Sequence, residues 1–172
     1  ACATCGIRVV MVDINEAAVQ RGLGTVAASL DRLIKKDKIS AADKDAALAR
    51  ISGSTNYDEL KAAQLVIEAA TENEALKLKI LGQLDGMLPA ETIIATNTSS
   101  ISITKLAAAT QRADRFIGMH FFNPVHKMKL VEIIRGPATD DETVARAYDY
   151  VLALGKTPIV VNDSRGFYTS RV

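Results

Sequence analysis

Short runs of apolar, mostly β-branched residues alternate along this chain with longer segments whose apolar residues recur at helical spacing. The run I-R-V-V-M-V at 7–12 is largely apolar on both faces, whereas 16–36 carries apolar side chains every three or four positions. A strand that is apolar on both faces suits a sheet covered on both sides. Strands alternating with helices indicate an α/β fold with a mostly parallel sheet.

The same pattern predicts the remaining elements. Residues 16–36 and 40–51, the latter with Ser40 as N-cap, form helices that are longer than a minimal crossover, so we expect them to project from the sheet as a hairpin. Residues 1–5 resemble the last turn of a helix closed by Gly6. The other segments are expected strands at 7–12, 65–70, 92–95, 116–120, 130–134 and 157–161, and expected helices at 74–87, 102–108 and 140–154.

Composition excludes several classes of protein. The 172 residues are 48% hydrophobic and 24% charged with a net charge of +1, so no strong field attracts nucleic acid or an anionic membrane. No apolar run approaches the length of a membrane span. No signal peptide opens the chain, although a truncated start would hide one, and two cysteines make no disulfide framework. We therefore expect a protein of a reducing compartment.

The cysteines Cys2 and Cys5 form a C-x-x-C spacing that invites a redox or zinc hypothesis. A structural zinc ion needs four ligands, and the chain has no second pair of cysteines. A redox C-x-x-C follows a strand at a helix start, whereas this one lies at a predicted helix end. We expect neither activity, and no metal site.

Asp13 ends the first predicted strand. In dinucleotide-binding sheets an acidic residue there accepts hydrogen bonds from the adenosine ribose and repels the 2′-phosphate of NADP. No basic residue follows until Arg21, which favours NAD, although an aspartate at a strand end is also ordinary turn chemistry. The glycine-rich loop of such folds lies about 20 residues upstream, which is before residue 1. Gly155-Lys156-Thr157 resembles the end of a P-loop, but Tyr150 occupies the position of its first glycine.

Two polar groups follow later strands. Residues 97–100 (N-T-S-S) come after the strand at 92–95, where parallel sheets bind ligands, and capping of the next helix explains only part of that run. His120 ends another strand, Asn123 lies in the following turn and Glu132 lies on the next strand. A turn that returns Glu132 to His120 gives a carboxylate-oriented imidazole, which suits a general base, although a lone histidine is more often structural.

The motifs G-M-H-F-F-N-P-V and M-K-L-V-E-I-I resemble the signature of 3-hydroxyacyl-CoA dehydrogenases. The segments V-V-M-V-D-I-N, A-T-E-N-E-A-L-K, T-N-T-S-S and N-D-S-R-G-F-Y are similar to the same family, and the last is most like the multifunctional fatty-acid oxidation α-subunits. The resemblance spans the whole chain. It implies a Rossmann-like NAD-binding domain over residues 1–161, with 162–172 opening a helical domain.

The resemblance also implies the activity and the residues that perform it. The expected reaction is oxidation of L-3-hydroxyacyl-CoA to 3-oxoacyl-CoA with NAD in fatty-acid β-oxidation. His120 is the implied base, Glu132 its orienting carboxylate, Ser99 a contact of the substrate hydroxyl and Asn123 a support of the same site. The implied cofactor ligands are Asp13, Glu72, Lys77 and Asn97, and the implied substrate contacts are Ser29, Lys36, Ser99 and Ser170.

The chain departs from the family pattern at both ends. The first strand and glycine loop are expected before residue 1, and the dimerising helical domain after Val172. Ser170 stands where many relatives carry an asparagine, which puts one substrate contact in doubt. By itself the chain is expected to bind NAD poorly or not at all and to be inactive.

The expected partners are the acyl-CoA substrate and either a second copy of the chain or a thiolase subunit, with no nucleic acid. The expected location is the bacterial cytoplasm, or a mitochondrion or peroxisome in a eukaryote. Two other hypotheses remain open, namely a related dehydrogenase acting on a sugar or hydroxy acid and a catalytically silent protein that keeps the fold.

Overall fold

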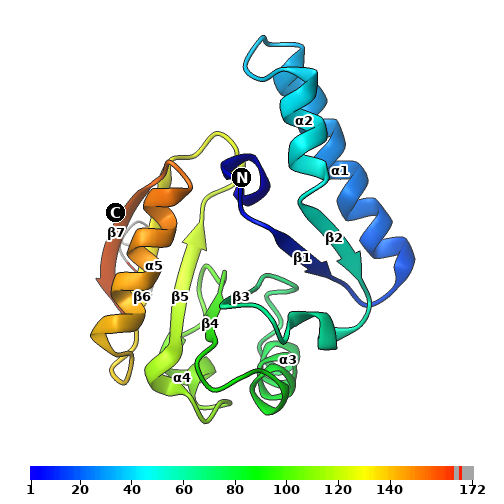
Figure 1. Ribbon diagram of the computed structural model, residues 1–172. Helices are drawn as coiled ribbons and strands as arrows, with labels where there is room; N and C mark the ends of the chain where they lie inside the picture. The colour runs from blue at the N-terminus through cyan, green and yellow to red at the C-terminus, as the bar shows by residue number, and fades with distance from the viewer. Residues whose placement is uncertain (165–166, 168–172) are drawn as a thin grey trace. The chain divides into compact units, whose positions relative to one another are not determined.

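The computed structural model describes residues 1–164 and Phe167, which belong to two compact units, Ala1–Leu60 and Lys61–Val172 (Figure 1). The first unit contains a two-stranded parallel sheet made by β1 (Val9–Val12) and β2 (Ile51–Ser54). The second contains a five-stranded sheet in the order β3-β4-β5-β6-β7. The alternation of strands and helices confirms the predicted α/β class.

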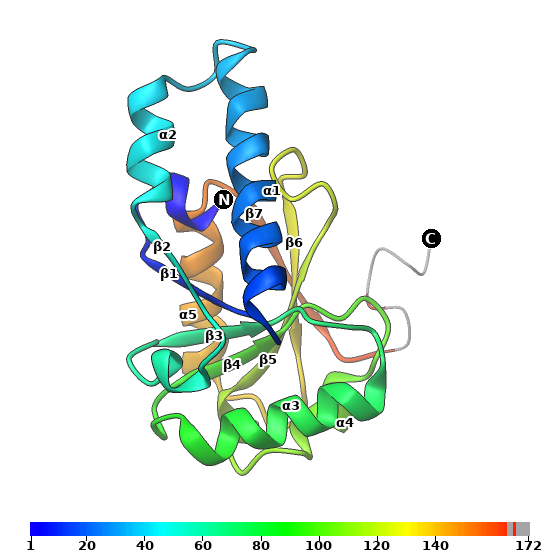
Figure 2. The ribbon, with the colours of Figure 1, turned by 90° about the vertical axis from the view of Figure 1, so that its right-hand side faces the viewer.

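A helical hairpin connects the two strands of the first unit. Its helices are α1 (Glu16–Ile34) and α2 (Ala41–Leu48), which Figure 2 shows side by side. The side chain of Asn15 caps α1, and Ser40 forms a capping box with Asp43 at the start of α2. The predicted hairpin and the predicted Ser40 cap are therefore confirmed. A small core joins the hairpin to the strands through Ala3, Leu30 and Ala47, with Val9, Val26, Leu33, Ile39, Leu48 and Ile51 packed around them.

The predicted helix over 40–51 is wrong at its end, because Ile51 begins β2. The segment I-S-G-S holds one large apolar residue, so its periodicity does not identify a strand. Its strand character comes from parallel pairing with β1, in which Val9 lies opposite Ile51. Gly53 is required there, since Val19 of α1 lies so close that any side chain at position 53 would overlap it.

Short 3₁₀ helices complete the connections. Gly6 ends the 3₁₀ helix at Cys2–Cys5 with a left-handed φ of 85°. This confirms the predicted C-cap, although the turn before it is 3₁₀ rather than α-helical. The three turns of this kind are η1 (Cys2–Cys5), η2 (Tyr57–Leu60) and η3 (Ala113–Arg115).

The five-stranded sheet of the second unit is mostly parallel. Strands β3, β4 and β5 run parallel, β6 is antiparallel to β5, and β7 is parallel to β6. The strands are β3 (Leu65–Glu68), β4 (Ile93–Thr96), β5 (Phe116–Phe121), β6 (Leu130–Arg135) and β7 (Thr157–Asn162). The helices are α3 (Glu74–Met87), α4 (Ile103–Ala107) and α5 (Asp141–Ala153).

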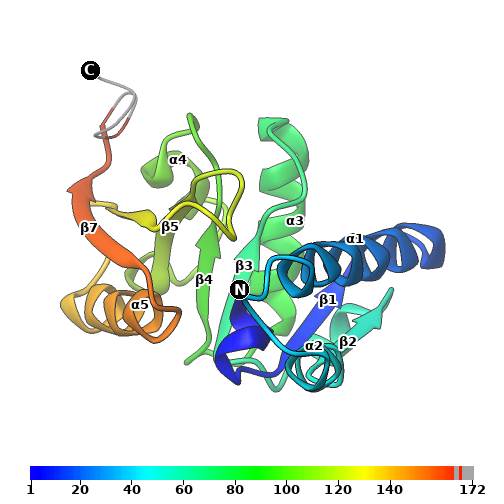
Figure 3. The same cartoon turned by 90° about the horizontal axis from the view of Figure 1, so that it is seen from above.

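Alternate residues of these strands pack on opposite faces of the sheet. Ile117 and Val131 belong to a buried cluster that includes Ala147 and Val151 of α5. On the other face, a side chain at Gly118 would overlap Ile103 of α4 and Ile134 of β6. Figure 3 shows α5 and α4 on different sides of the strands. The site described below lies on the α4 face, because its residues keep the parity of Gly118 along β5.

No helix among residues 1–164 is long and apolar enough to cross a membrane.

Candidate active site

Polar side chains gather at the carboxyl ends of the parallel strands, all on the α4 face of the sheet. Glu68 and Thr96 end β3 and β4 and lie opposite each other in the ladder. His120 is near the end of β5, directly opposite Glu132 of β6. A parallel sheet brings these strand ends to one edge, so polar residues far apart in sequence lie along the same edge of the sheet.

His120 and Glu132 form a buried pair, as the sequence predicted. Nδ1 of His120 lies 2.7 Å from Oε2 of Glu132, and the side chains are 12% and 0% exposed. The antiparallel register sets this contact, since paired residues project side by side from one face. Because Nδ1 faces the carboxylate, Nε2 is the ring nitrogen left to exchange a proton with a substrate.

Two phenylalanine rings flank the imidazole. The ring centroid of Phe122 lies 4.4 Å from that of His120, and the centroid of Phe167 lies 6.2 Å away. Phe167 is buried. These apolar neighbours and the Glu132 contact restrict rotation of the ring, so its reactive edge has a defined direction.

Glu72 organises the turn after β4. Its Oε1 accepts hydrogen bonds from the backbone N–H of Ser99 at 2.7 Å, from Ser99 Oγ at 2.9 Å and from Thr98 Oγ1 at 3.0 Å. Its Oε2 lies 3.7 Å from Nζ of Lys77. The predicted site residues Ser99 and Glu72 are therefore in direct contact.

The electrostatics of Glu72 favour its charged form. Partial burial raises the pKa of its carboxyl, but the two hydrogen bonds from Ser99, the bond from Thr98 and the charge of Lys77 together lower it below the ordinary value. Glu72 thus places a half-exposed negative charge beside the hydroxyl of Ser99.

Lys77 lies beneath this turn rather than at the surface. Its side chain is 1% exposed, and Nζ lies 2.6 Å from Oε2 of Glu68. The same carboxylate accepts from Thr96 Oγ1 at 2.9 Å and from the backbone N–H of Ala70 at 2.8 Å. The buried charges are compensated, and the ammonium lies between two carboxylates.

Sequence reasoning missed Glu68 and Thr96. The available signal was a carboxylate at the end of the apolar strand L-V-I-E, where a buried charge requires a partner. Nothing local to the sequence identifies that partner as Lys77.

The two predicted asparagines occupy different environments. Oδ1 of Asn97 accepts from the backbone N–H of Phe121 at 2.8 Å, which joins the ends of β4 and β5. Asn123 is exposed in the loop after β5 and precedes Pro124 through a cis peptide bond.

Three predicted residues belong to the first unit. Asp13 is exposed just after β1, and its Oδ1 accepts from the backbone N–H of Ile14 at 2.7 Å. Ser29 lies on α1 and accepts from Arg32 at 2.8 Å, whereas Lys36 is exposed beyond the helix end. Ser170 lies outside the described residues.

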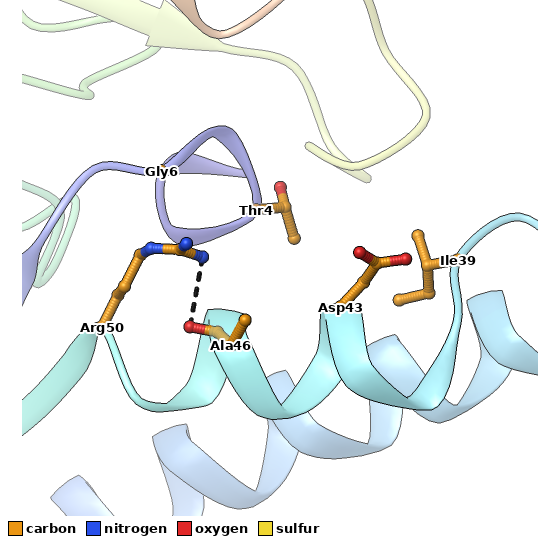
Figure 4. A pocket seen from close by; sticks show the side chains of 6 residues that line it. All are labelled: Thr4, Gly6, Ile39, Asp43, Ala46 and Arg50. Atoms are coloured by element: carbon orange, nitrogen blue, oxygen red, sulfur yellow. Dashed lines mark hydrogen bonds between the residues drawn. The ribbon is translucent and has the colours of Figure 1, made fainter.

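Two hollows in the structure contain none of the predicted site residues. The one in Figure 4 belongs to the first unit, where Arg50 bridges the carbonyls of Ala3 and Ala46 at 3.3 and 3.1 Å. Its lining residues are Thr4, Gly6, Ile39, Asp43, Ala46 and Arg50. The other hollow lies in the second unit and is lined by 61–64, Pro89, Glu91, Thr92 and Arg146. Within residues 1–164 and Phe167, no three His, Cys, Asp or Glu side chains form a cluster that could hold a metal ion.

Comparison with known proteins relates both units to one family. The family model described as 3-hydroxyacyl-CoA dehydrogenase, NAD binding domain, matches residues 1–164. The fatty acid oxidation complex subunit alpha of Colwellia psychrerythraea is 43% identical over 167 residues, covering 97% of this chain and 23% of the relative.

Solved structures agree with this match. The (S)-3-hydroxybutyryl-CoA dehydrogenase of Ralstonia eutropha is 64% identical with a TM-score of 0.98, covering 99% of this chain and 60% of that one. The 3-hydroxybutyryl-CoA dehydrogenase of Escherichia coli K12 is 38% identical with a TM-score of 0.93, covering 96% of this chain and 35% of that one. The chain therefore spans only part of the length of these relatives.

Proposed function

The chain belongs to the 3-hydroxyacyl-CoA dehydrogenase family as its NAD-binding domain, and from this we propose that the complete protein oxidises an L-3-hydroxyacyl-CoA to the 3-oxoacyl-CoA with NAD. The observation that carries the proposal is the buried pair of His120 and Glu132 at the carboxyl edge of the sheet. Oxidation of a secondary alcohol requires a base for the hydroxyl proton, and this pair provides one.

His120 removes the proton of the 3-hydroxyl through Nε2. Glu132 holds Nδ1 at 2.7 Å, which sets the orientation of the ring and stabilises the imidazolium that forms. Since Glu132 is fully buried, its negative charge acts on the imidazole with little screening by water. NAD, when bound, supplies the acceptor for the hydride that leaves C3.

Ser99 positions the substrate hydroxyl. Its backbone N–H and its Oγ both donate to Glu72, so the turn that carries it has a defined conformation. Asn97 ties the end of β4 to β5 and thereby relates the Ser99 turn to the strand of His120. Such alignment of reacting groups is a main source of rate enhancement in reactions between two bound partners.

The residues present fit NAD as the cofactor. Asp13 presents an exposed carboxylate at the carboxyl end of β1, the position at which dinucleotide-binding sheets hold the adenosine ribose. A negative charge there repels the extra phosphate of NADP.

A short acyl chain is the first substrate to test. The relative that is 64% identical is an (S)-3-hydroxybutyryl-CoA dehydrogenase, whereas the curated relative that is 43% identical belongs to a fatty acid oxidation complex. The similarity to the fatty acid oxidation complex subunit makes longer 3-hydroxyacyl-CoA substrates the next ones to test.

The test is oxidation of (S)-3-hydroxybutyryl-CoA by the complete protein, followed as NADH formation. His120→Ala should lower turnover about 10²–10⁴-fold, because the reaction then lacks its general base. Asp149→Ala, which changes an exposed residue of α5, is the control and should keep most of the turnover. Equal rates for the His120 variant and the wild type, with chemistry limiting, would contradict the assignment.

The proposal extends to the partners and the location of the complete protein. The complete protein is proposed to assemble with itself, or with a thiolase subunit as a component of a fatty acid oxidation complex, in the bacterial cytoplasm. Affinity purification from the native host, with size measurement of the product, distinguishes a homo-oligomer from a complex with a second kind of subunit. Fractionation of the host cells tests the location.

A further inference from the structure

The loop between His120 and Glu132 is mostly exposed to solvent. Residues 122–129 connect β5 to β6 and carry Asn123 at their start. Inside the loop, the backbone N–H groups of Lys127 and Met128 both donate to the carbonyl of Pro124, at 2.8 and 3.1 Å. Apart from Val125, residues 123–129 are exposed, so the loop lacks a substantial core.

A lysine from another connection closes this loop. Nζ of Lys156 donates to the carbonyl of Val125 at 2.6 Å and to the carbonyl of Met128 at 2.7 Å. Lys156 stands between α5 and β7, immediately after Gly155. The ammonium group therefore connects the 122–129 loop to the turn between α5 and β7 of the same unit.

The two hydrogen bonds from Lys156 to the loop carbonyls are called the clamp below, and their chemistry suits holding a loop in place. An ammonium group has three donors and no acceptor, and hydrogen bonds from a charged donor are stronger than neutral ones. Two carbonyls converge on one nitrogen, so removing the ammonium leaves both without this partner. A lysine that only exposed its charge to water in the turn after α5 would not need to contact the carbonyls of Met128 and Val125. These lie 28 and 31 residues away in the sequence.

We propose that Lys156 is a positioning residue of the active site, which holds the 122–129 loop so that Phe122 keeps its place beside His120. Phe122 contacts the imidazole ring, with centroids 4.4 Å apart, so movement of the loop reaches the base directly. The catalytic consequence rests on the proposed dehydrogenase function, whereas the effect on the loop does not.

The first test measures the loop itself. Trypsin cleaves after Lys127 and Lys129, which are exposed, only when the loop opens enough to enter the protease. In the complete protein, Lys156→Met should accelerate cleavage there about tenfold or more, because two charge-assisted hydrogen bonds are lost. Lys79→Met, which removes an exposed lysine on α3, is the control and should cleave like the wild type.

The second test measures the reaction. Lys156→Met should lower kcat/KM for the hydroxyacyl-CoA about tenfold or more while leaving the shape of the pH–rate profile unchanged, because Glu132 still holds His120. Lys156→Arg keeps a charged donor and should recover part of both the loop protection and kcat/KM.

The outcomes separate the two proposals. Wild-type cleavage of the Lys156→Met loop would overturn the clamp, and faster cleavage with unchanged kcat/KM would overturn the positioning role. If the wild type shows no dehydrogenase activity, the proposed function fails while the cleavage rates still decide the clamp. Should Lys156→Met fold poorly, Lys156→Gln is the second variant, and amide exchange at Lys127 and Met128 measures the loop in it. Lost protection at these two amides supports the clamp, and protection equal to the wild type refutes it.

Discussion

His120 and Ser99 are each held by a different carboxylate, and the two carboxylates have different surroundings. Glu132 is fully buried and contacts one ring nitrogen of His120. Glu72 is half exposed and accepts hydrogen bonds from Ser99 and Thr98, with Lys77 behind it. A buried carboxylate acts strongly on one neighbour, while the exposed one stays charged through its hydrogen bonds.

Substitution of Glu132 by glutamine removes the charge of the side chain and keeps its shape. Glu132→Gln keeps the packing of the side chain, but a neutral amide stabilises the imidazolium less. We expect kcat to fall by at least about tenfold across the pH range. The measurement is kcat/KM of the complete protein across pH, and a profile that coincides with the wild type would argue against the pair.

Asp13 is expected to determine the choice of cofactor. Asp13→Ala removes the charge that repels the 2′-phosphate, so the preference for NAD over NADP should become smaller, mostly through a lower KM for NADP. The ratio of kcat/KM values for the two cofactors measures this. A wild-type protein that prefers NADP would refute the role given to Asp13.

At the scale of elements, close packing of α4 on β5 relates the Ser99 turn to the strand of His120. Gly118 lies two residues before His120 on the same face, and a side chain there would come within 2.8 Å of Ile103 and Ile134. Ile103 is the first residue of α4 and is fully buried. The absence of a side chain at 118 thus allows the helix to lie directly on the strand.

Gly118→Ala should therefore destabilise the protein by about 1–3 kcal/mol through overpacking. Gly86→Ala is the matched control, because a side chain at this position of α3 meets no atom and alanine favours a helix. Urea denaturation of both variants compares them. Equal stability of the two would mean that α4 adjusts its position without cost.

Across the whole molecule, carboxylates at helix starts link stability to pH. Asp43 belongs to the capping box of α2, and Asp140 is the N-cap of α5. Their pKa values are lowered mainly by backbone N–H donors, from Ser40 and Thr143 respectively. For Asp163, partial burial raises the pKa, but hydrogen bonds from Thr104 and Ser102 at the start of α4 outweigh it and lower the pKa. Each carboxylate is thus more acidic in the folded chain than in the unfolded one.

A lowered folded pKa contributes stability above the unfolded value, and this stability is lost as the pH falls through the folded value. The ordinary values are 3.8 for the aspartates and 4.5 for Glu72, whose pKa is also lowered. The free energy of unfolding should therefore be level at neutral pH and decline below about pH 5. Urea denaturation at a series of pH values measures the decline.

A double variant tests the source of this acid sensitivity. Asp140→Asn with Asp163→Asn should give a shallower decline than the wild type, because two carboxylates that resist protonation are gone. Asp149→Asn, at an exposed position of α5, is the control and should leave the slope unchanged. A double variant with the wild-type slope would place the sensitivity elsewhere.

Periodicity along the chain determined the class of most elements and the position of the polar strand ends. Apolar runs such as 116–120 and 130–134 identify strands by themselves, and His120 and Glu132 lie on them. Motifs around these residues also determined the family, which the comparison confirmed over residues 1–164. This information is local, since it concerns neighbours within one or two turns of the chain.

Only the tertiary structure decided which of these residues meet. The four residues of β2 predict no strand by themselves. They form one because they pair with β1, and because Gly53 leaves room for α1 to pack on the strand. Lys77 is buried because Glu68 and Glu72 compensate its charge, and Lys156 reaches a loop that precedes it by about 30 residues. The physical reason is the same in each case: a buried charge, or a strand with few apolar side chains, is stabilised by partners distant in sequence, and local pattern does not specify those partners.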